Sequence, residues 1–150
     1  MTKVAKMGEA YTTEFIKDNI ENFKSFFTKL NDKRFTVKEL APYIYELNPA
    51  EETSVDQVIG LMALNHGNEV GGLFVLLEFL SLLDKGLVNL PGKIVIGLGS
   101  VESAKLGKRF FEKDLNRCYG DVIGEGKDFQ RAKVVMEAFK ECHMSLDLHQ

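Results

Sequence analysis

The sequence has few cysteines, no long apolar segment and no excess of positive charge, and each of these absences removes a class of protein. Two cysteines in 150 residues are too few for a disulfide framework. Cys118 and Cys142 also lack C-x-x-C spacing, so we expect both to be reduced. No apolar run reaches the roughly 18 to 20 residues that span a bilayer. The amino-terminal segment has no signal-peptide core, so the cytoplasm is the expected location.

Charge and composition also limit the partners. The net charge is -3 at pH 7, and Lys and Arg are scattered among Asp and Glu, which gives no basic field for holding phosphates. We therefore expect no nucleic acid as a partner, and the lack of a bilayer-spanning run predicts no membrane. The hydrophobic share of 45% and the charged share of 27% are ordinary for a globular protein, and 150 residues suit one domain.

The first fifty residues have the pattern of helices. Apolar residues recur at spacings of three and four over residues 11–30, which predicts a helix with one buried stripe, capped by Thr12 or Thr13. A second helix is predicted over residues 37–47. We interpret residues 1–52 as a helical amino-terminal extension packed on the core.

From residue 53 onward the pattern changes to that of an α/β protein. Apolar runs predict strands, and amphipathic segments predict helices between them, in the order strand 58–64, helix 69–83, strand 94–98, helix 128–141 and strand 144–148. This alternation indicates a parallel sheet covered by helices. Ligands of such sheets bind beyond the carboxyl ends of the strands. His66 and His149 lie just past the ends of the first and third strands, so both should lie on this edge.

The first strand runs directly into a His-Gly-Asn-Glu turn. His66 and Glu69 are three positions apart and can point at one ion, and His149 would complete a set of two histidines and a carboxylate, as in many catalytic zinc sites. The H-x-x-E spacing is common by itself, and an isolated histidine after a strand is more often a structural residue. Gly67 permits a tight turn. The strand before this turn directs it toward the ligand-binding edge of the sheet, which favours the metal interpretation.

A second polar cluster, RFFEKDLNR, spans residues 109–117. Because Arg binds carboxylates bidentately, Arg117 with Asn116 can hold a substrate carboxylate, and Arg109 can stabilise an oxyanion. The competing interpretation is a solvated loop in which Asp114 pairs with an arginine.

Three blocks together resemble the succinylglutamate desuccinylase and aspartoacylase family of zinc-dependent hydrolases, which is related to the zinc carboxypeptidases. The blocks are NHGNEVGG at residues 65–72, RFFEKDLNR at residues 109–117 and DLH at residues 147–149, and their order matches the family. The resemblance covers residues 56–150 and is far more specific than any one block.

The resemblance implies a mainly parallel, zinc-carboxypeptidase-like α/β sheet covered by helices over residues 53–150, with one zinc ion per chain. It gives roles to eight residues: metal ligation by His66, Glu69 and His149, polarisation of the scissile carbonyl by Arg109, binding of a substrate carboxylate by Asn116 and Arg117, and ordering of the site by Asp114 and Asp147.

The implied reaction is hydrolysis of the amide bond of a small acidic N-acyl amino acid, such as N-succinylglutamate or N-acetylaspartate, with a place in arginine catabolism. Gly99-Ser100-Val101 stands where the family has Gly-Asn-Pro, so substrate choice can differ. The sequence stops at Gln150, before the family's general-base glutamate. We therefore expect a piece of a longer enzyme, or a truncated product that binds metal and turns over poorly.

Two other functions stay open from the sequence. The first is a peptidase resembling the zinc carboxypeptidases. The second is a non-catalytic module that retains the zinc site and docks a partner, or a second copy in a homo-oligomer, through its phenylalanine-rich amino-terminal helix.

Overall fold

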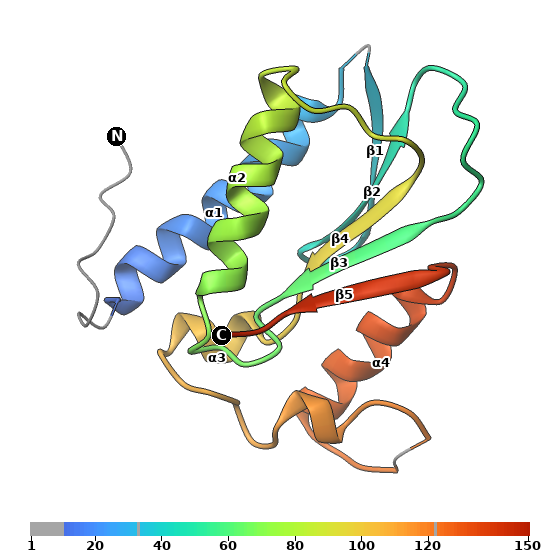
Figure 1. Cartoon of the computed structure of the whole chain (residues 1–150). Coiled ribbons are helices and arrows are strands. Elements are labelled where there is room, and N and C mark those ends of the chain that lie inside the picture. Colours follow the sequence, from blue (N-terminus) through green and yellow to red (C-terminus); the bar gives the residue numbers. More distant parts are fainter. Residues whose placement is uncertain (1–10, 33, 122) are drawn as a thin grey trace.

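The computed structural model describes residues 11–32, 34–121 and 123–150, and the first ten residues of the predicted extension lie outside them (Figure 1). The elements follow one another in the order α1 (Thr13–Leu30), β1 (Phe35–Ala41), β2 (Ile44–Pro49), β3 (Ile59–Ala63), α2 (Gly71–Asp84), β4 (Ile94–Leu98), α3 (Val101–Lys105), the 3-10 turn η1 (Leu115–Arg117), α4 (Lys127–Phe139) and β5 (Met144–Leu148). All elements predicted from residue 58 onward are confirmed, with ends shifted by two residues at most.

One five-stranded sheet, in the order β1-β2-β4-β3-β5, forms the middle layer of the fold. β3 is parallel to both β4 and β5, whereas β2 is antiparallel to both β1 and β4. α1 and α2 lie on one face of the sheet and α4 lies against the other (Figure 1). The predicted α/β fold, with parallel strands covered by helices, is confirmed, and an antiparallel hairpin extends the sheet at one edge.

The core is divided between the two faces of β4, because successive side chains of a strand point to opposite sides. Ile94, Ile96 and Leu98 belong to the large apolar cluster beneath α1 and α2. Val95 packs with Val135 of α4 in a smaller cluster on the other face. The central strands are therefore covered on both sides, as their continuous apolar runs predict.

The helix predicted over residues 37–47 is wrong, because this segment forms the hairpin of β1 and β2. Ile44 packs toward α4, and Leu47 packs toward α1 and α2. A strand that is buried on both faces thus produces the three-residue apolar spacing that also marks a helix. The extension is a helix followed by a hairpin of the common sheet, and the domain boundary after residue 52 stays a prediction.

The start of α1 and the end of α2 lie where the sequence predicts them. The Thr12 hydroxyl accepts a hydrogen bond from the Phe15 amide at 3.2 Å and caps α1. Gly86 follows α2 with a φ of 69°, and its amide donates to the Leu83 carbonyl at 3.0 Å. A left-handed residue at this position favours glycine.

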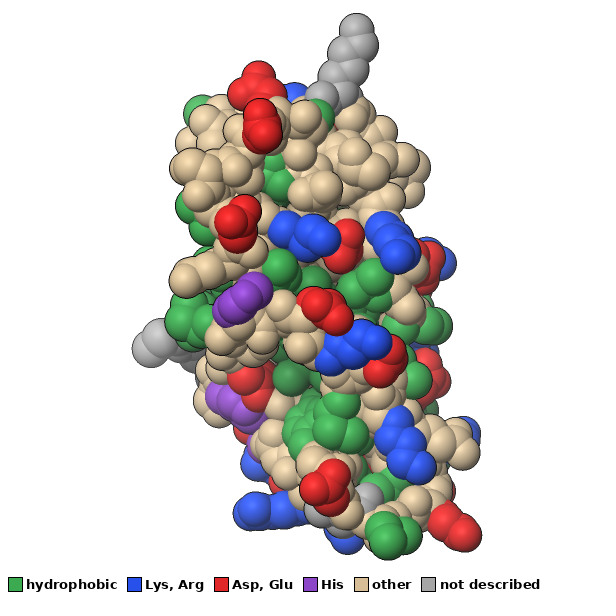
Figure 2. All heavy atoms as spheres, turned by 90° about the vertical axis from the view of Figure 1, so that its right-hand side faces the viewer, with side chains coloured by type: hydrophobic (Ala, Val, Ile, Leu, Met, Phe, Trp, Pro, Cys, Tyr) green, Lys and Arg blue, Asp and Glu red, His purple; other side chains and the backbone are tan. Residues whose placement is uncertain are grey.

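The surface carries charges of both signs. On the face shown in Figure 2, Lys and Arg side chains are interspersed with Asp and Glu side chains. Across the described ranges, no helix is both long enough and apolar enough to cross a bilayer. Cys118 and Cys142 are free thiols in this structure.

Candidate metal centre

The turn after β3 is fixed by its neighbours. Leu64 is fully buried and has a φ of 58°, in the left-handed region. The Gly67 amide donates to the Arg109 carbonyl at 2.8 Å, and a Cβ on Gly67 would collide with the backbone nitrogen of Ala104. His66 lies between these two positions and is 4% exposed. The ring of His66 is therefore held by the packed backbone on both sides of it.

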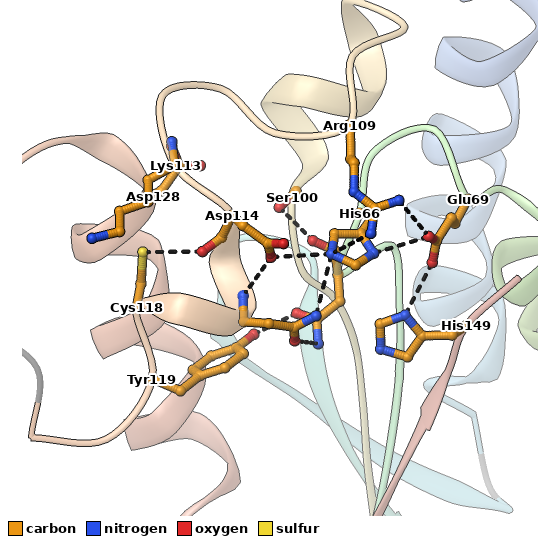
Figure 3. A network of polar contacts seen from close by, with 12 residues as sticks. His66, Glu69, Ser100, Arg109, Lys113, Asp114, Cys118, Tyr119, Asp128 and His149 are labelled. Atoms are coloured by element: carbon orange, nitrogen blue, oxygen red, sulfur yellow. Dashed lines mark hydrogen bonds and ion pairs between the residues drawn. The ribbon is translucent and has the colours of Figure 1, made fainter.

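Three donor side chains converge at the carboxyl edge of the sheet, two from the β3–α2 turn and one from the end of β5 (Figure 3). Nδ1 of His66 lies 3.0 Å from Glu69 Oε1, and Nδ1 of His149 lies 3.0 Å from Glu69 Oε2. The two ring centroids are 5.2 Å apart, and one ligand atom from each residue lies within 4.8 Å of the others. The structure thus brings together the three residues that the sequence assigned to one edge.

Each imidazole has a further carboxylate at its other nitrogen. His66 Nε2 lies 3.0 Å from Asp114 Oδ1, and His149 Nε2 lies 2.6 Å from Asp147 Oδ2. Histidines that ligate metals commonly donate their second N–H to such a carboxylate, which fixes the tautomer and the orientation of the ring. Asp114 and Asp147 lie where the proposed ordering role requires them, and that role stays a prediction.

The electrostatics of the cluster favour a cation. Burial raises the pKa of the Glu69 carboxyl, but hydrogen bonds with His149, the Gln150 amide and His66 outweigh burial and hold this pKa below its ordinary value. Burial lowers the pKa of His149, whereas its contacts with the carboxylates of Glu69 and Asp147 raise it by more. The Glu69 carboxyl therefore stays ionised and creates a negative potential at the two rings.

The contacts of His149 test whether these donors fit a metal ion. A neutral imidazole has one N–H and one lone pair, yet both nitrogens of His149 face carboxylate oxygens. Both contacts are satisfied only by an imidazolium, or by a cation between Nδ1 and Glu69. Ligand atoms around a tetrahedral zinc lie about 3.3 Å apart, close to the 3.0 Å between Glu69 and each Nδ1. The donor set therefore fits zinc.

The loop after α3 that carries Arg109 and Arg117 lies beside the three candidate metal ligands, His66, Glu69 and His149. Arg109 Nη1 is 3.0 Å from Glu69 Oε1, and Nη2 is 3.3 Å from His66 Nε2. Asn116 Nδ2 is 3.2 Å from the same His66 nitrogen. Arg117 is exposed, and its side chain makes no hydrogen bond or ion pair with any described residue. The structure brings Arg109 and Asn116 next to the candidate metal ligands and leaves the guanidinium of Arg117 in solvent.

Sequence reasoning missed Asn65, a buried amide in the β3 turn that is held by two hydroxyl groups. Asn65, which precedes His66, is 3% exposed. Its amide oxygen accepts a hydrogen bond from the Tyr119 hydroxyl at 2.6 Å, and its backbone carbonyl accepts one from the Ser100 hydroxyl at 2.9 Å. The available signal was a single amide side chain at the end of an otherwise apolar run.

Arg131 of α4 was also missed. Its guanidinium donates to the carbonyls of Leu98 at 2.6 Å and Gly99 at 2.9 Å, where β4 ends. Arg131 precedes the buried Val135 by one helical turn, so a basic residue on the inward face of a predicted helix was the signal. The carboxyl edge of the sheet is thus tied to α4 as well as to the arginine-bearing loop.

The fold and the site define an α/β protein with a candidate active site at the carboxyl ends of its parallel strands. The family model described as the succinylglutamate desuccinylase/aspartoacylase catalytic domain matches residues 56–150. The chain belongs to this family, and the resemblance of its three sequence blocks is confirmed.

Two relatives are similar in sequence. The succinylglutamate desuccinylase of Photorhabdus laumondii is 32% identical over 81 residues, which cover 54% of this chain and 24% of that protein. The probable aspartoacylase of Parasynechococcus marenigrum is 28% identical over 94 residues, which cover 56% of this chain and 30% of that protein. The matched region is therefore under a third of each relative.

Solved structures show the same fold. The succinylglutamate desuccinylase of Chromobacterium violaceum matches with a TM-score of 0.67 at 20% identity, covering 85% of this chain and 45% of that one. The enzyme of that name from Vibrio parahaemolyticus matches with a TM-score of 0.64 at 19% identity, covering 83% and 50%. The chain spans about half the length of these structures.

Proposed function

We propose that the chain carries the metal site of a zinc-dependent hydrolase that cleaves the amide bond of a small acidic N-acyl amino acid, such as N-succinylglutamate or N-acetylaspartate. The observation that carries this proposal is the convergence of His66, Glu69 and His149 within 4.8 Å. Membership of the family and the names of the two relatives support the reaction class.

One zinc ion per chain would be held by Nδ1 of His66, Nδ1 of His149 and the carboxylate of Glu69. When bound, zinc lowers the pKa of a coordinated water to about 7 and polarises a substrate carbonyl, which is the chemistry of amide hydrolysis at neutral pH. Asp114 and Asp147 accept from the other ring nitrogens and keep both Nδ1 atoms turned to Glu69.

Arg109 provides the positive charge beside the scissile bond. The Arg109 side chain is 48% exposed, and its Nη1 lies 3.0 Å from Glu69 Oε1. It therefore borders the three candidate metal ligands and is reachable from solvent. A carbonyl oxygen that gains negative charge during attack would be stabilised by these N–H donors. Arg109 also offsets part of the negative charge of the carboxylates.

Asn116 and Arg117 provide the grip on an acidic substrate. Both are exposed, and the Asn116 amide nitrogen points at His66. Arg presents paired N–H donors that match a carboxylate and keeps its charge at any physiological pH. A neighbouring amide donor and guanidinium therefore suit the carboxylate of an acyl amino acid better than a neutral peptide.

A non-catalytic module that retains zinc is the second candidate, and one observation favours it. Glu69, Asp114 and Asp147 each contact a histidine ring, so none of these three is free to act as the general base. We assign no residue of this chain to that step.

The test is calorimetry of zinc-loaded protein with N-succinylglutamate, N-acetylaspartate and a neutral dipeptide, run beside an assay of amine release. We expect the two acyl amino acids to bind, and Arg117→Gln to weaken binding by about tenfold through loss of a charged carboxylate contact. Lys108→Gln is the control for loss of one exposed positive charge.

Binding with amine release supports the hydrolase, and binding without release supports the module. Release from the dipeptide alone would indicate a peptidase. Failure of both acyl amino acids to bind would refute the proposal.

A further inference from the structure

Asn65 places a buried amide at the centre of the candidate site. A buried amide is costly unless its polar atoms are hydrogen-bonded. Its oxygen accepts from the Tyr119 hydroxyl at 2.6 Å, and its nitrogen donates to Asn116 Oδ1 at 2.9 Å and to the Asp147 carboxylate. One side chain thus connects the turn that carries His66 with two segments that are remote in the sequence.

The orientation of this amide is set from both sides. An ionised carboxylate only accepts hydrogen bonds, so the nitrogen of Asn65 must face Asp147 and its oxygen must face Tyr119. Burial raises the pKa of Tyr119 above its ordinary value, so its hydroxyl stays protonated and donates. A flipped amide would turn its oxygen toward the Asp147 carboxylate, which has no hydrogen to donate, and would lose that hydrogen bond.

The two acceptors of the Asn65 amide each act on the proposed active site. Asp147 Oδ2 also contacts His149 Nε2 at 2.6 Å, so its position sets the direction in which the His149 ring points. Asn116 has its oxygen occupied by Asn65, which turns its N–H groups toward His66, where Nδ2 lies 3.2 Å from Nε2.

We propose that Asn65, held by Tyr119, is a positioning residue for both halves of the site. It fixes Asp147, so that His149 keeps Nδ1 toward Glu69, and it fixes Asn116 with its donors toward the site. This inference rests on the proposed function, because it assumes that His149 ligates zinc.

The first test is the zinc affinity of Asn65→Asp, measured by competition with a chromophoric chelator. The variant keeps the shape of the side chain but replaces the donor to Asp147 and Asn116 with an oxygen. We expect affinity to fall by about 10- to 100-fold, as for other residues that orient metal ligands. Asn68→Asp is the matched control: it makes the same change in the same turn, and Asn68 is exposed, so affinity should not fall.

The second test is Tyr119→Phe, which keeps the ring and removes the hydroxyl that holds Asn65. We expect a smaller loss of zinc affinity, of about threefold to tenfold, and none for the control Tyr11→Phe. Because Tyr119 acts through Asn65, adding Tyr119→Phe to Asn65→Asp should have no further effect, whereas independent contributions would add.

The visible absorption of the Co²⁺-loaded protein provides a readout that general destabilisation would not change. Both variants should alter the intensity of the cobalt bands, because the ligands move, and both controls should match the wild type. Circular dichroism shows whether Asn65→Asp folds, and Tyr119→Phe decides the question if it does not.

Wild-type affinity and spectrum in both variants would overturn this inference and leave the proposed function intact. A wild-type protein that binds no zinc would overturn the proposed function together with the inference.

Discussion

The two strand ends that carry the imidazoles differ in how firmly the fold holds them. β3 pairs with β4 on one side and β5 on the other, and His66 after it is 4% exposed. β5 pairs with β3 alone among the described strands, and Met144 and Leu146 are 54% and 49% exposed. The His149 side chain is 39% exposed. The core therefore sets one imidazole, whereas an edge strand and polar contacts set the other.

This difference has a consequence for metal binding. Elements with few buried contacts open locally at a lower free energy than core elements do. A ligand that needs both strand ends stabilises the weaker of them, because it binds only the closed arrangement. We expect zinc to act mainly on β5.

The largest contrast is expected in stability when one apolar side chain is removed just after β3 and another is removed from the middle of β5. Leu64→Ala should lower the free energy of unfolding by about 2 to 5 kcal/mol, since Leu64 is fully buried and the change leaves a cavity. Leu146→Ala on β5 should change it by no more than about 0.5 kcal/mol. Urea denaturation of the two variants measures both effects, and equal losses would contradict the distinction between the strands.

Hydrogen exchange tests whether zinc stabilises β5, with β1 at the opposite edge of the sheet as the reference strand. At a free zinc concentration of 100 times its dissociation constant, zinc raises the free energy of any local opening that breaks the site by about 2.7 kcal/mol. Amides of β5 should therefore exchange up to about 100-fold more slowly with zinc. Local opening of β1, at the far edge, leaves the site intact and should not respond. Unchanged exchange in β5 would show that zinc does not bind there.

Gly71 and Gly72 begin α2, and only Gly72 packs closely against the backbone of β5. An alanine at each position changes the helix propensity equally, so a difference between the two variants reports the contact with β5. A Cβ on Gly72 would collide with the carbonyl oxygen of Leu148, whereas one on Gly71 would meet only the flexible end of Gln150, at 3.2 Å. Gly72→Ala should push the end of β5 away and lower zinc affinity by about tenfold. Gly71→Ala should leave it unchanged. The same chelator competition measures both, and a larger loss for Gly71→Ala would reverse our assignment.

The smallest effect on stability is expected from removal of the Tyr45 hydroxyl, which lies in the core beneath α1. Tyr45 is 4% exposed, and its hydroxyl has no hydrogen-bond partner among the described residues. Burial raises the pKa of Tyr45 to about 12. Because the folded pKa exceeds the unfolded value of about 10, this tyrosine contributes stability below pH 10 that is lost as the pH rises toward 12.

Tyr45→Phe should therefore match or exceed the wild type in stability at pH 7, by up to about 1 kcal/mol. It should also lose less stability between pH 10 and the folded pKa of about 12. Denaturation at pH 7, 10 and 11 measures both effects, and a large loss at pH 7 would mean that the hydroxyl has a partner.

The sequence predicts the parallel part of the fold, because each strand appears as a local apolar run. It also predicts that His66 and His149 share one edge, because the carboxyl ends of parallel strands lie at the same edge of a sheet. It does not predict the hairpin of β1 and β2, since Ile44 and Leu47 are buried on opposite faces and imitate a helix. It also does not predict the contact of Asn65 with Tyr119, because side chains 54 positions apart meet only through tertiary packing. Long-range polar contacts leave no period in the sequence.

The central claim is that His66, Glu69 and His149 hold one zinc ion, and metal content tests it most directly. Protein stripped with a chelator, reloaded with zinc and dialysed is analysed by atomic emission for the wild type, His66→Ala and His143→Ala. His143 serves as the control, because it lies at the opposite end of β5 and accepts a hydrogen bond from the Val58 amide at 3.1 Å. We predict about one zinc per chain in the wild type and the control and none in His66→Ala; equal zinc in all three proteins would contradict the assignment.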